Sequence, residues 1–395
     1  MAHAVVTGAG IGGLTAALAL ARNGWQVTVL EQAASIEPVG AGLAVAPNAL
    51  RALDMIGLGH EVRKLSAIQG EAGLWRPSGR WLSRTTAEDA AARYGDSIVL
   101  LTRSALVGIL AARLPRGALR LGTRAVSADP RTGLVTLATS AGGTGGTGGT
   151  GGTETIQADL VVAADGIRSR TRAALFPGHP EPGYAGVTSW RALVPFPGPV
   201  GASETWGAGL VFGVMPLAGG QVYCYATAPV PAGLRAESEK DELIRLFGRW
   251  HDPIPGLLAA AEPGAVLRHD IYSLDTPLPA LHSGRIALLG DAAHPMTPNL
   301  GQGACQAIED AVVLARHVSP GGGPAPDVTA GLAAYSRERL ARTTPIVRRS
   351  RLVGRVSGWR DPLAVALRDG ALRAAGMLGP AVAVRQFDDV FRWPA

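Results

Sequence analysis

Gly8-Ala9-Gly10-Ile11-Gly12-Gly13 is the stretch that decides the fold of this chain. It follows the short apolar run Ala4-Val5-Val6 and opens the helical pattern of residues 14–20. A strand, a glycine-rich turn and a helix in this order are typical of a dinucleotide-binding unit, where free amides at the helix N-terminus face a diphosphate. Gly8 is expected to make the tight turn, Gly10 to admit the diphosphate, and Gly13 to let helix and strand pack closely. The predicted glycine set is Gly8, Gly10, Gly12 and Gly13.

The second predicted strand, residues 26–30, ends at the acidic residue Glu31. An acid at the end of this strand, about twenty residues beyond the fingerprint, suits the two hydroxyls of a ribose better than a phosphorylated ribose. We therefore expect Glu31 to hold an unphosphorylated adenosine.

Two further motifs follow strand-like apolar runs later in the chain. Ala164-Asp165-Gly166-Ile167-Arg168-Ser169 comes after residues 160–163, and Leu289-Gly290-Asp291-Ala292-Ala293-His294-Pro295 ends the run 285–289. Alone, the first of these two motifs is equally well explained as a strand-to-helix turn in which Asp165 only caps the helix. The second leads through a loop rich in proline and glycine into the helical pattern of residues 304–311.

In order and spacing, the three motifs resemble those of the single-component flavoprotein aromatic hydroxylases, the family of salicylate and para-hydroxybenzoate hydroxylases, over nearly the whole chain. The resemblance implies that Asp165 serves both FAD and the pyridine nucleotide, and that Asp291 accepts hydrogen bonds from the ribityl chain. It also implies that Pro38-Val39-Gly40-Ala41-Gly42, followed by Pro47-Asn48-Ala49-Leu50, passes behind the isoalloxazine ring. It further implies that Arg103 reaches the ribose and phosphates rather than only solvent. The FAD-binding residues implied are Gly8, Gly10, Gly12, Gly13, Glu31, Gly42, Arg103, Asp165, Gly290, Asp291, Gly301, Gln302 and Gly303.

In this family NAD(P)H reduces the flavin, O2 adds to form a C4a-hydroperoxide, and the terminal oxygen passes to an electron-rich ring. The resemblance thus implies a hydroxylase of a phenolic or indolic compound, in natural-product biosynthesis or aromatic catabolism. The sequence holds one dinucleotide fingerprint, assigned to FAD, so NAD(P)H is expected to reach the flavin without a nucleotide-binding domain of its own. Two alternatives stay open: a flavoprotein of the same fold that epoxidises or reduces an isoprenoid, and a non-catalytic FAD-binding sensor.

Substrate contacts are expected from a strand-rich segment and from the third motif. Arg191 follows Trp190 as in a Trp-Arg-Gly pattern of the family, although Ala192 replaces the glycine. Arg191 either holds an anionic oxygen or supports the domain interface through a salt bridge. Tyr223 and Tyr225 share one strand face, where they either pack or contact substrate, and a tyrosine of this strand approaches the substrate in related urate and phenol hydroxylases. His294 either caps the loop or shuttles a proton. The catalytic set is Arg191, Tyr223, His294 and Pro295, and the substrate set is Arg191, Tyr223, Tyr225 and Pro295.

Several partner classes are disfavoured by composition. The net charge of +6 is carried almost wholly by arginine, and no aromatic stacking platform accompanies the arginines of residues 337–355, so nucleic acid is not expected. Neither a signal peptide nor an apolar run long enough to span a bilayer is found. Cys224 and Cys305 indicate no disulfide framework, and no His/Asp cluster has metal-ligand spacing. We expect a cytoplasmic monomer or homodimer without stable membrane association. Urate is disfavoured as a substrate because residues 210–213 lack a basic side chain.

The predicted fold is α/β: a Rossmann-like FAD-binding domain of the glutathione-reductase type, an inserted, mainly antiparallel sheet domain for substrate, and a C-terminal helical tail. Strands are expected at 187–194, 209–216 and 221–227, between Pro and Gly turns. The Gly-Gly-Thr repeat of residues 142–153 is expected to form a mobile hairpin loop without chemistry. The domains are predicted as residues 1–70, 97–175 and 276–345 for FAD, 71–96 and 176–275 for substrate, and 346–395 for the tail.

Overall fold

The computed structural model describes residues 1–36, 42–65, 71–139, 153–319, 321–323 and 327–393. The expected hairpin of the Gly-Gly-Thr repeat therefore lies outside the described residues, as do Pro38 to Ala41 of the segment assigned to the back of the flavin. Within the described part of the chain, no helix is long and apolar enough to cross a membrane.

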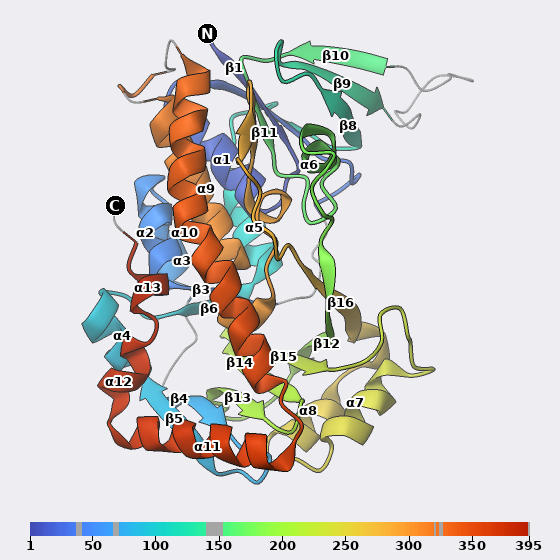
Figure 1. The fold of residues 1–395 in the computed structure, drawn as a ribbon, viewed down its shortest axis with the longest axis vertical. Helices are drawn as coiled ribbons and strands as arrows, with labels where there is room; N and C mark the ends of the chain where they lie inside the picture. The colour runs from blue at the N-terminus through green and yellow to red at the C-terminus, as the bar shows by residue number, and fades with distance from the viewer. Residues whose placement is uncertain (37–41, 66–70, 140–152, 320, 324–326, 394–395) are drawn as a thin grey trace.

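A six-stranded sheet forms the core of the end of the molecule that holds the N-terminus, called here the N-terminal half although it also contains later segments such as β18, α9 and α10. Its strand order is β17-β18-β11-β1-β2-β7, and all neighbours are parallel except β17 and β18. Most of the central strand residues are fully buried, as expected for a parallel sheet covered by helices. The strands run from the N-terminal end of the molecule toward its middle (Figure 1). They are β1 (His3–Thr7), β2 (Gln26–Leu30), β7 (Leu119–Arg120), β11 (Leu160–Ala163), β17 (His282–Ser283) and β18 (Ile286–Leu288).

Helices α1 (Ile11–Arg22) and α9 (Gly303–Val318) pack against each other, and α9 packs in turn against α10 (Val328–Ser357). Ile11 to Leu20 of α1 are all buried, which explains why this helix is apolar all round rather than amphipathic. The remaining elements of this half are α2 (Pro47–Met55), α3 (Gly59–Arg63), α5 (Arg103–Ala112), α6 (Arg170–Leu175), a ribbon of β3 (Gly42–Val45) and β6 (Val99–Thr102), and a small sheet of β8 (Thr123–Ala128), β9 (Leu134–Thr139) and β10 (Thr153–Gln157).

A seven-stranded sheet forms the other end of the molecule, in the order β16-β12-β15-β14-β13-β4-β5. Every pairing is antiparallel except that of β13 with β4. The strands expected at 187–194, 209–216 and 221–227 correspond to β12, β14 and β15. The strands are β4 (Glu71–Trp75), β5 (Trp81–Thr86), β12 (Gly183–Pro195), β13 (Ala202–Trp206), β14 (Val211–Leu217), β15 (Gln221–Ala228) and β16 (Leu267–Ser273).

The two faces of this sheet have different neighbours. One face, which includes Trp190 and Phe212, packs against α7 (Glu239–Phe247) and α8 (Ile254–Ala260) in a core of its own. The other face includes Tyr223, which packs against Leu100 of β6 and so meets the N-terminal half. Because side chains alternate along a strand, Arg191 and Tyr225 belong to this second face.

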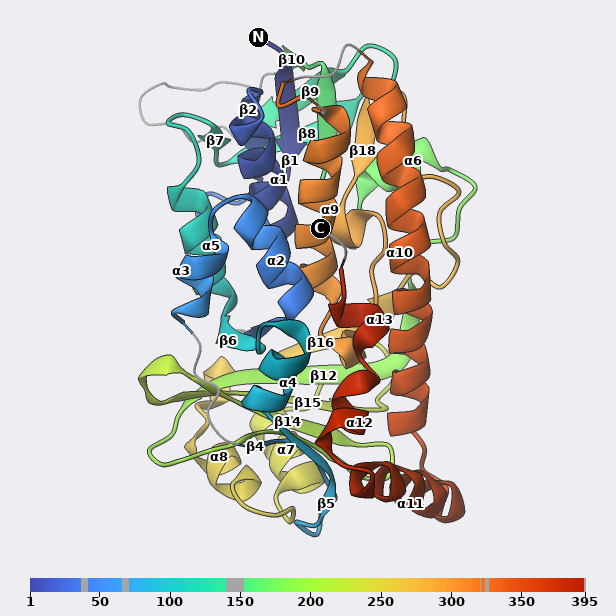
Figure 2. The same cartoon turned by 90° about the vertical axis from the view of Figure 1, so that its left-hand side faces the viewer.

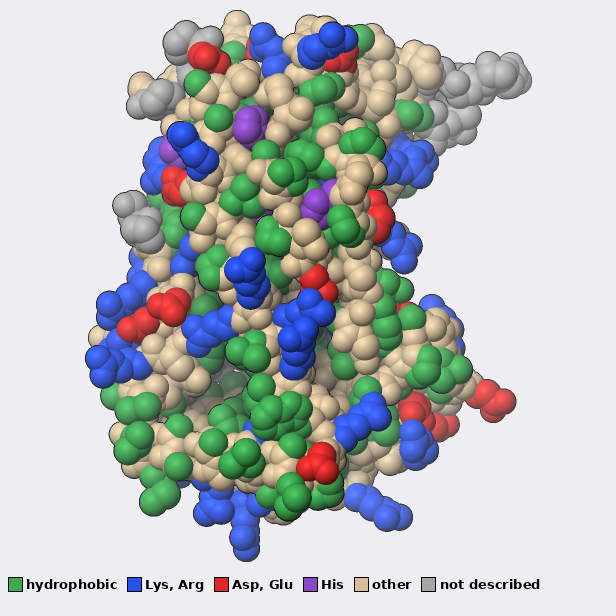
Figure 3. Space-filling view, in the orientation of Figure 1, with side chains coloured by type: hydrophobic (Ala, Val, Ile, Leu, Met, Phe, Trp, Pro, Cys, Tyr) green, Lys and Arg blue, Asp and Glu red, His purple; other side chains and the backbone are tan. Residues whose placement is uncertain are grey.

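The C-terminal helices join the two halves. Helix α10 runs lengthwise along the molecule (Figures 1 and 2), and the expected division at residues 345/346 falls inside it. It is followed by α11 (Pro362–Met377), α12 (Pro380–Arg385) and α13 (Asp388–Phe391), which turn back toward α4 (Ala87–Tyr94). Tyr94 fixes this return, since its hydroxyl donates to the carbonyl of Val384 at 2.6 Å. Figure 3 shows hydrophobic side chains along α11. Leu363 and Leu367 of this helix are exposed.

Replacement of Phe247 by alanine should strongly destabilise the sheet domain. Phe247 is fully buried between α7 and the sheet, so the Phe247→Ala variant loses buried apolar surface and leaves a cavity. We expect the free energy of unfolding in urea to fall by about 3–5 kcal/mol. The control is Ile244→Ala on the same helix, where the side chain is 41% exposed and a much smaller change is expected. Equal losses for the two variants would contradict this packing.

Candidate functional site

The three sequence motifs meet at one edge of the parallel sheet. Each follows a strand, namely β1, β11 and β18, and these three strands are neighbours. Because parallel strands end at the same edge, their loops lie side by side at the position where open α/β sheets bind ligands. The N-terminus of α1 opens this edge, and no side chain caps its first amides.

The glycines of the first loop serve three purposes. Gly8 has a φ of +105°, and a Cβ there would lie 2.3 Å from the carbonyl oxygen of Ala164. A Cβ on Gly12 would lie 2.5 Å from the Leu289 side chain, so this glycine brings α1 against its neighbours rather than lining a ligand space. A Cβ on Gly10, in contrast, would meet one described atom beyond its chain neighbours within 4 Å, a guanidinium nitrogen of Arg103 at 3.7 Å. Gly10 and Arg103 therefore border an open approach to the α1 N-terminus.

Glu31 is held beside this loop by two backbone amides. Its Oε2 accepts from Ala9 at 2.8 Å, and its Oε1 accepts from Ala33 at 2.9 Å. Each carboxylate oxygen has a second lone pair that a ligand hydroxyl can use. The position and orientation fit the predicted contact with a ribose.

Asp165 has one oxygen engaged and one free. Its Oδ2 accepts from the amide and hydroxyl of Thr171 at 3.2 and 3.0 Å. Its Oδ1 is buried and has no hydrogen-bond partner among the described residues. The N-cap of α6 is Ser169 rather than Asp165, since the Ser169 hydroxyl accepts from the amide of Arg172. Capping therefore does not account for the free oxygen of Asp165.

Arg172 ties the second motif to the third. Its guanidinium is almost fully buried and donates to the carbonyl oxygens of Ile167 at 2.8 Å and Ala292 at 3.2 Å. These bonds fix the spacing between the loop after β11 and the turn after β18.

Asp291 lies where basic side chains from several elements converge. Asp291 is exposed to solvent, yet the surrounding protein desolvates its carboxyl group and so raises the pKa of that group. The charges of His294, Arg103, Arg172 and Arg191 oppose that rise. Arg191 comes from the second sheet, so its charge links that sheet electrostatically to the turn that carries Asp291. Gly303, at the start of α9, is also adjacent: its Cβ would lie 3.9 Å from Oδ1 of Asp291.

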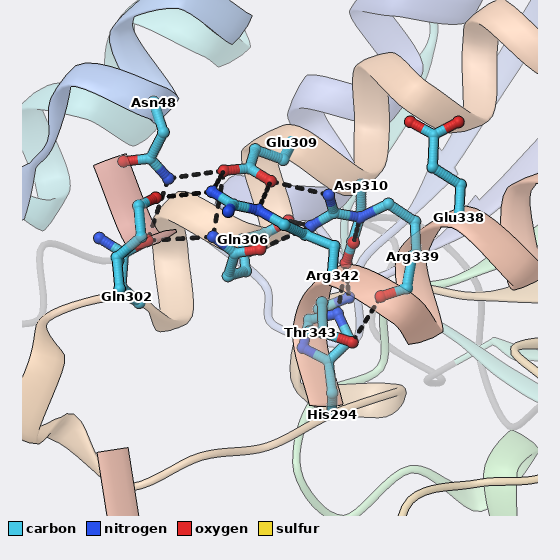
Figure 4. Close-up of polar contacts among 12 residues, drawn as sticks. Asn48, His294, Gln302, Gln306, Glu309, Asp310, Glu338, Arg339, Arg342 and Thr343 are labelled. Atoms are coloured by element: carbon cyan, nitrogen blue, oxygen red, sulfur yellow. Dashed lines mark hydrogen bonds and ion pairs between the residues drawn. The ribbon is translucent and has the colours of Figure 1, made fainter. Parts of the chain in front are cut away.

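A buried ionic network supports the Gly290–Asp291 turn (Figure 4). Arg339 of α10 is fully buried, and its guanidinium contacts Glu309 at 2.7 Å and Asp310 at 2.6 Å. The other oxygen of Asp310 accepts from the amide of Gly290 at 2.9 Å and pairs with Nε2 of His294 at 2.7 Å. Burial would raise the pKa of Asp310, but the charges of His294 and Arg339 overcome this effect and lower it to about 2. This contact of His294 favours a structural role over proton shuttling.

Two amide side chains at the edge of this network have unpaired groups. The Oε1 of Gln302 accepts from Asn48 and from Gln306, each at 3.0 Å. The Nε2 of Gln302 and the Oδ1 of Asn48 are buried without a partner in the described part of the chain, and both point away from the network in Figure 4. The free amide nitrogen of Gln302 can donate and the free amide oxygen of Asn48 can accept. A ligand whose edge offers an acceptor beside a donor, such as the pyrimidine edge of a flavin, would satisfy both groups. Asn48 belongs to the segment 47–50 assigned above to the back of the flavin, but it is not among the FAD-binding residues named individually.

Arg191, Tyr223 and Tyr225 lie on the face of the second sheet that packs against the N-terminal half. No ion pair joins Arg191 to another described residue, so the interface salt bridge considered above is not observed. The pKa of Tyr223 is raised above its usual value by burial, and the charge of nearby Arg191 offsets only part of this rise. The ring of Tyr223 packs on Gly42, where a Cβ would lie 2.3 Å from the ring atoms. Gly42 thus makes room for Tyr223.

The loop between the third motif and α9 links the two halves. The carbonyl of Pro295 accepts from the amide of Leu274 at 2.9 Å, just beyond β16. Gly301 adopts a φ of +61° and ends the 3-10 turn Pro298–Leu300 before α9 begins. Among the described residues, no group of three or more His, Cys, Asp and Glu side chains is arranged to hold a metal ion.

Comparison with known proteins identifies relatives along most of the chain. Residues 1–194 and 266–350 match the family described as FAD binding domain. The chain is 38% identical over 376 residues to aurachin C monooxygenase/isomerase from Stigmatella aurantiaca, with 93% of each chain covered. It is 31% identical over 355 residues to FAD-dependent urate hydroxylase from Klebsiella pneumoniae, with 88% of each covered. Its fold matches the crystal structure of HpxO from Klebsiella pneumoniae in complex with FAD and uric acid, with a TM-score of 0.87, 28% identity, and 99% and 96% of the two chains covered.

Removal of the buried guanidinium should destabilise the whole network. In Arg339→Met, Glu309 and Asp310 lose a partner that no water can readily replace, and the free energy of unfolding in urea should fall by about 3–5 kcal/mol. The control is Arg337→Met, two residues earlier on the exposed side of α10, for which a change within about 0.5 kcal/mol is expected. A stability of Arg339→Met close to that of the control would contradict the supporting role of the network.

Proposed function

Because the chain belongs to the FAD-dependent aromatic hydroxylases, we propose that it is a monooxygenase that uses NADH or NADPH and O2 to hydroxylate a phenolic or indolic compound. The observation that carries this proposal is Arg191 of the substrate sheet, a cation with no ion pair among the described residues, whose charge acts on the Asp291 carboxyl of the cofactor-binding edge. This interaction supports a charge for substrate recognition on the side of the sheet that faces the site of cofactor chemistry.

The residues present fit FAD. Glu31 offers oxygens to a ribose, the free Oδ1 of Asp165 and the carboxylate of Asp291 offer acceptors to hydroxyls, and the open amides of α1 suit the diphosphate. The unpaired groups of Asn48 and Gln302 offer an acceptor and a donor to the pyrimidine edge. Bound FAD supplies the electron transfer from NAD(P)H and the activation of oxygen.

Arg191 would hold the ionised oxygen of the substrate. A guanidinium keeps its charge at every physiological pH, and an electrophilic oxygen transfer is faster to a phenolate than to a phenol. Tyr223 stays protonated because its pKa is raised by burial, so its hydroxyl orients the substrate rather than carrying negative charge.

Urate is not carried over from the relatives to this chain. Strand β14, Val211–Leu217, contributes no basic side chain to the substrate face. A set of phenols and indoles, tested for compounds that accelerate NAD(P)H oxidation and yield a product one oxygen heavier, is the direct search for the substrate. An enzyme that accepts only isoprenoids lacking an ionisable group would favour the epoxidation alternative instead.

The purified protein should be yellow and should release FAD on denaturation. In Asp291→Ala, loss of a carboxylate acceptor should weaken FAD binding by about 1–3 kcal/mol, measured by titration of the apoprotein with FAD. Asp241→Ala, an exposed acid on α7, is the control and should bind FAD as the wild type does. FMN or no flavin in the denatured supernatant would contradict the assignment.

In Arg191→Leu, hydroxylation should slow by about tenfold to a thousandfold, while FAD content stays normal. The reason is the loss of the positive charge that favours the substrate anion. Arg249→Leu, an exposed arginine of the same domain, should keep the wild-type rate. The anchoring role of Arg191 fails if its leucine variant hydroxylates at the wild-type rate.

A further inference from the structure

The proposed function assigns no role to Glu204, a carboxylate on β13. Its Oε2 accepts from the indole Nε1 of Trp206 at 2.9 Å, and its Oε1 accepts from the hydroxyl of Tyr225. No ion pair joins it to an Arg, Lys or His of the described residues, although the surrounding protein raises its pKa by desolvation. Each oxygen of this partly buried carboxylate accepts from a different donor, so a glutamine, which has one oxygen and one NH2 group, would not satisfy both donors. A carboxylate without a cationic partner is costly here, and its position at the end of the Tyr225 hydrogen bond lets it accept a proton from that hydroxyl.

The register of the sheet puts Glu204 on the substrate face. Arg191 of β12 lies opposite Tyr225 of β15, Tyr225 lies opposite Gly213 of β14, and Gly213 lies opposite Glu204. Residues paired across strands share a face, so this row crosses four strands on one side of the sheet. It is the side on which Tyr223 packs against the N-terminal half.

Gly213 is what allows the contact between Tyr225 and Glu204. A Cβ at Gly213 would lie 2.0 Å from Cζ of Tyr225, so the tyrosine ring lies across β14 and its hydroxyl reaches the next strand. Because this hydroxyl donates its proton to Glu204, the Tyr225 oxygen is left to accept a hydrogen bond from any ligand above it.

We propose that Tyr225 and Glu204 form a proton relay that ionises the substrate, an inference that rests on the proposed function. The O–H or N–H bond of the substrate ring breaks and its proton passes to the Tyr225 oxygen. At the same time the O–H bond of Tyr225 breaks and that proton passes to Oε1 of Glu204. The products are a substrate anion beside Arg191, a neutral tyrosine and a neutral carboxylic acid, without any change in oxidation state. The relay requires a ring with a weakly acidic O–H or N–H group.

Charged and titratable groups surround the relay from several elements, among them Asp291 after β18 and His269 of β16, which interact electrostatically with Arg191. Arg191 of β12 attracts the anion that forms, and Tyr223 of β15 lies beside Tyr225 with a distance of 5.9 Å between ring centroids. Arg368 of α11 lies over the Trp206 ring at 5.7 Å, but it is paired with Asp369 at 2.9 Å. Among the residues that the structure describes, no cation is thus paired with Glu204.

The test is the pH dependence of hydroxylation by Glu204→Gln and Tyr225→Phe holoenzymes, with the phenol or indole accepted by the wild type as substrate. Both variants keep the shape of the residue they replace. Below the substrate pKa each should be slowed by about 100-fold, and the rate should recover toward that of the wild type once the substrate ionises in solution. The double variant should be no slower than either single variant, since both residues act on one proton.

The matched control is Glu239→Gln. Glu239 also accepts from a tryptophan indole, that of Trp190 at 2.6 Å, but it lies on α7 at the opposite face of the same sheet. Its variant should keep the wild-type pH profile, and FAD content should be equal in all variants. A Glu204→Gln profile that matches the wild type, or that is lowered equally at every pH, would overturn the relay. A wild-type enzyme that hydroxylates no phenol or indole would instead overturn the proposed function.

Discussion

The buried contact of Arg339 with Glu309 and Asp310 is the interaction on which the rest of the structure depends. It joins α10 to α9, and through Asp310 it holds the amide of Gly290 and the imidazole of His294. These bonds from α9 thereby fix the turn that carries Asp291. Because α10 also runs the length of the molecule, the same contact relates the cofactor edge to the C-terminal helices.

The second organising constraint is the two-sided sheet. One face is closed by α7 and α8, which leaves the other free to meet the cofactor edge. Arg191, Tyr225 and Glu204 lie on that open face in register. In the proposed reaction the edge of the parallel sheet would supply groups that bind FAD, while the second sheet would supply a charge and proton acceptors for the substrate.

The local motifs could be predicted from sequence because a few adjacent residues determine their geometry. Gly8 needs its positive φ within a single turn, and Glu31 ends the strand next to that turn. Asn48 lies in the segment 47–50 that the resemblance assigned to the flavin, but its free oxygen beside Gln302 could not be predicted. Nor could the position of Glu204, because both depend on register and packing between distant segments. Glu204 contacts Tyr225 only because Gly213 leaves room for the tyrosine ring to lie across β14. For the same reason, the sequence did not indicate that Gly12 packs against Leu289 or that Gly42 receives Tyr223.

The central claim is that this chain transfers one atom of molecular oxygen to an aromatic ring. The most direct measurement is the mass of the product formed under 18O2 with NAD(P)H and an accepted phenol or indole. The account predicts a hydroxylated product that carries one atom of 18O. A product without the label, or one labelled only from 18O-water, would contradict it.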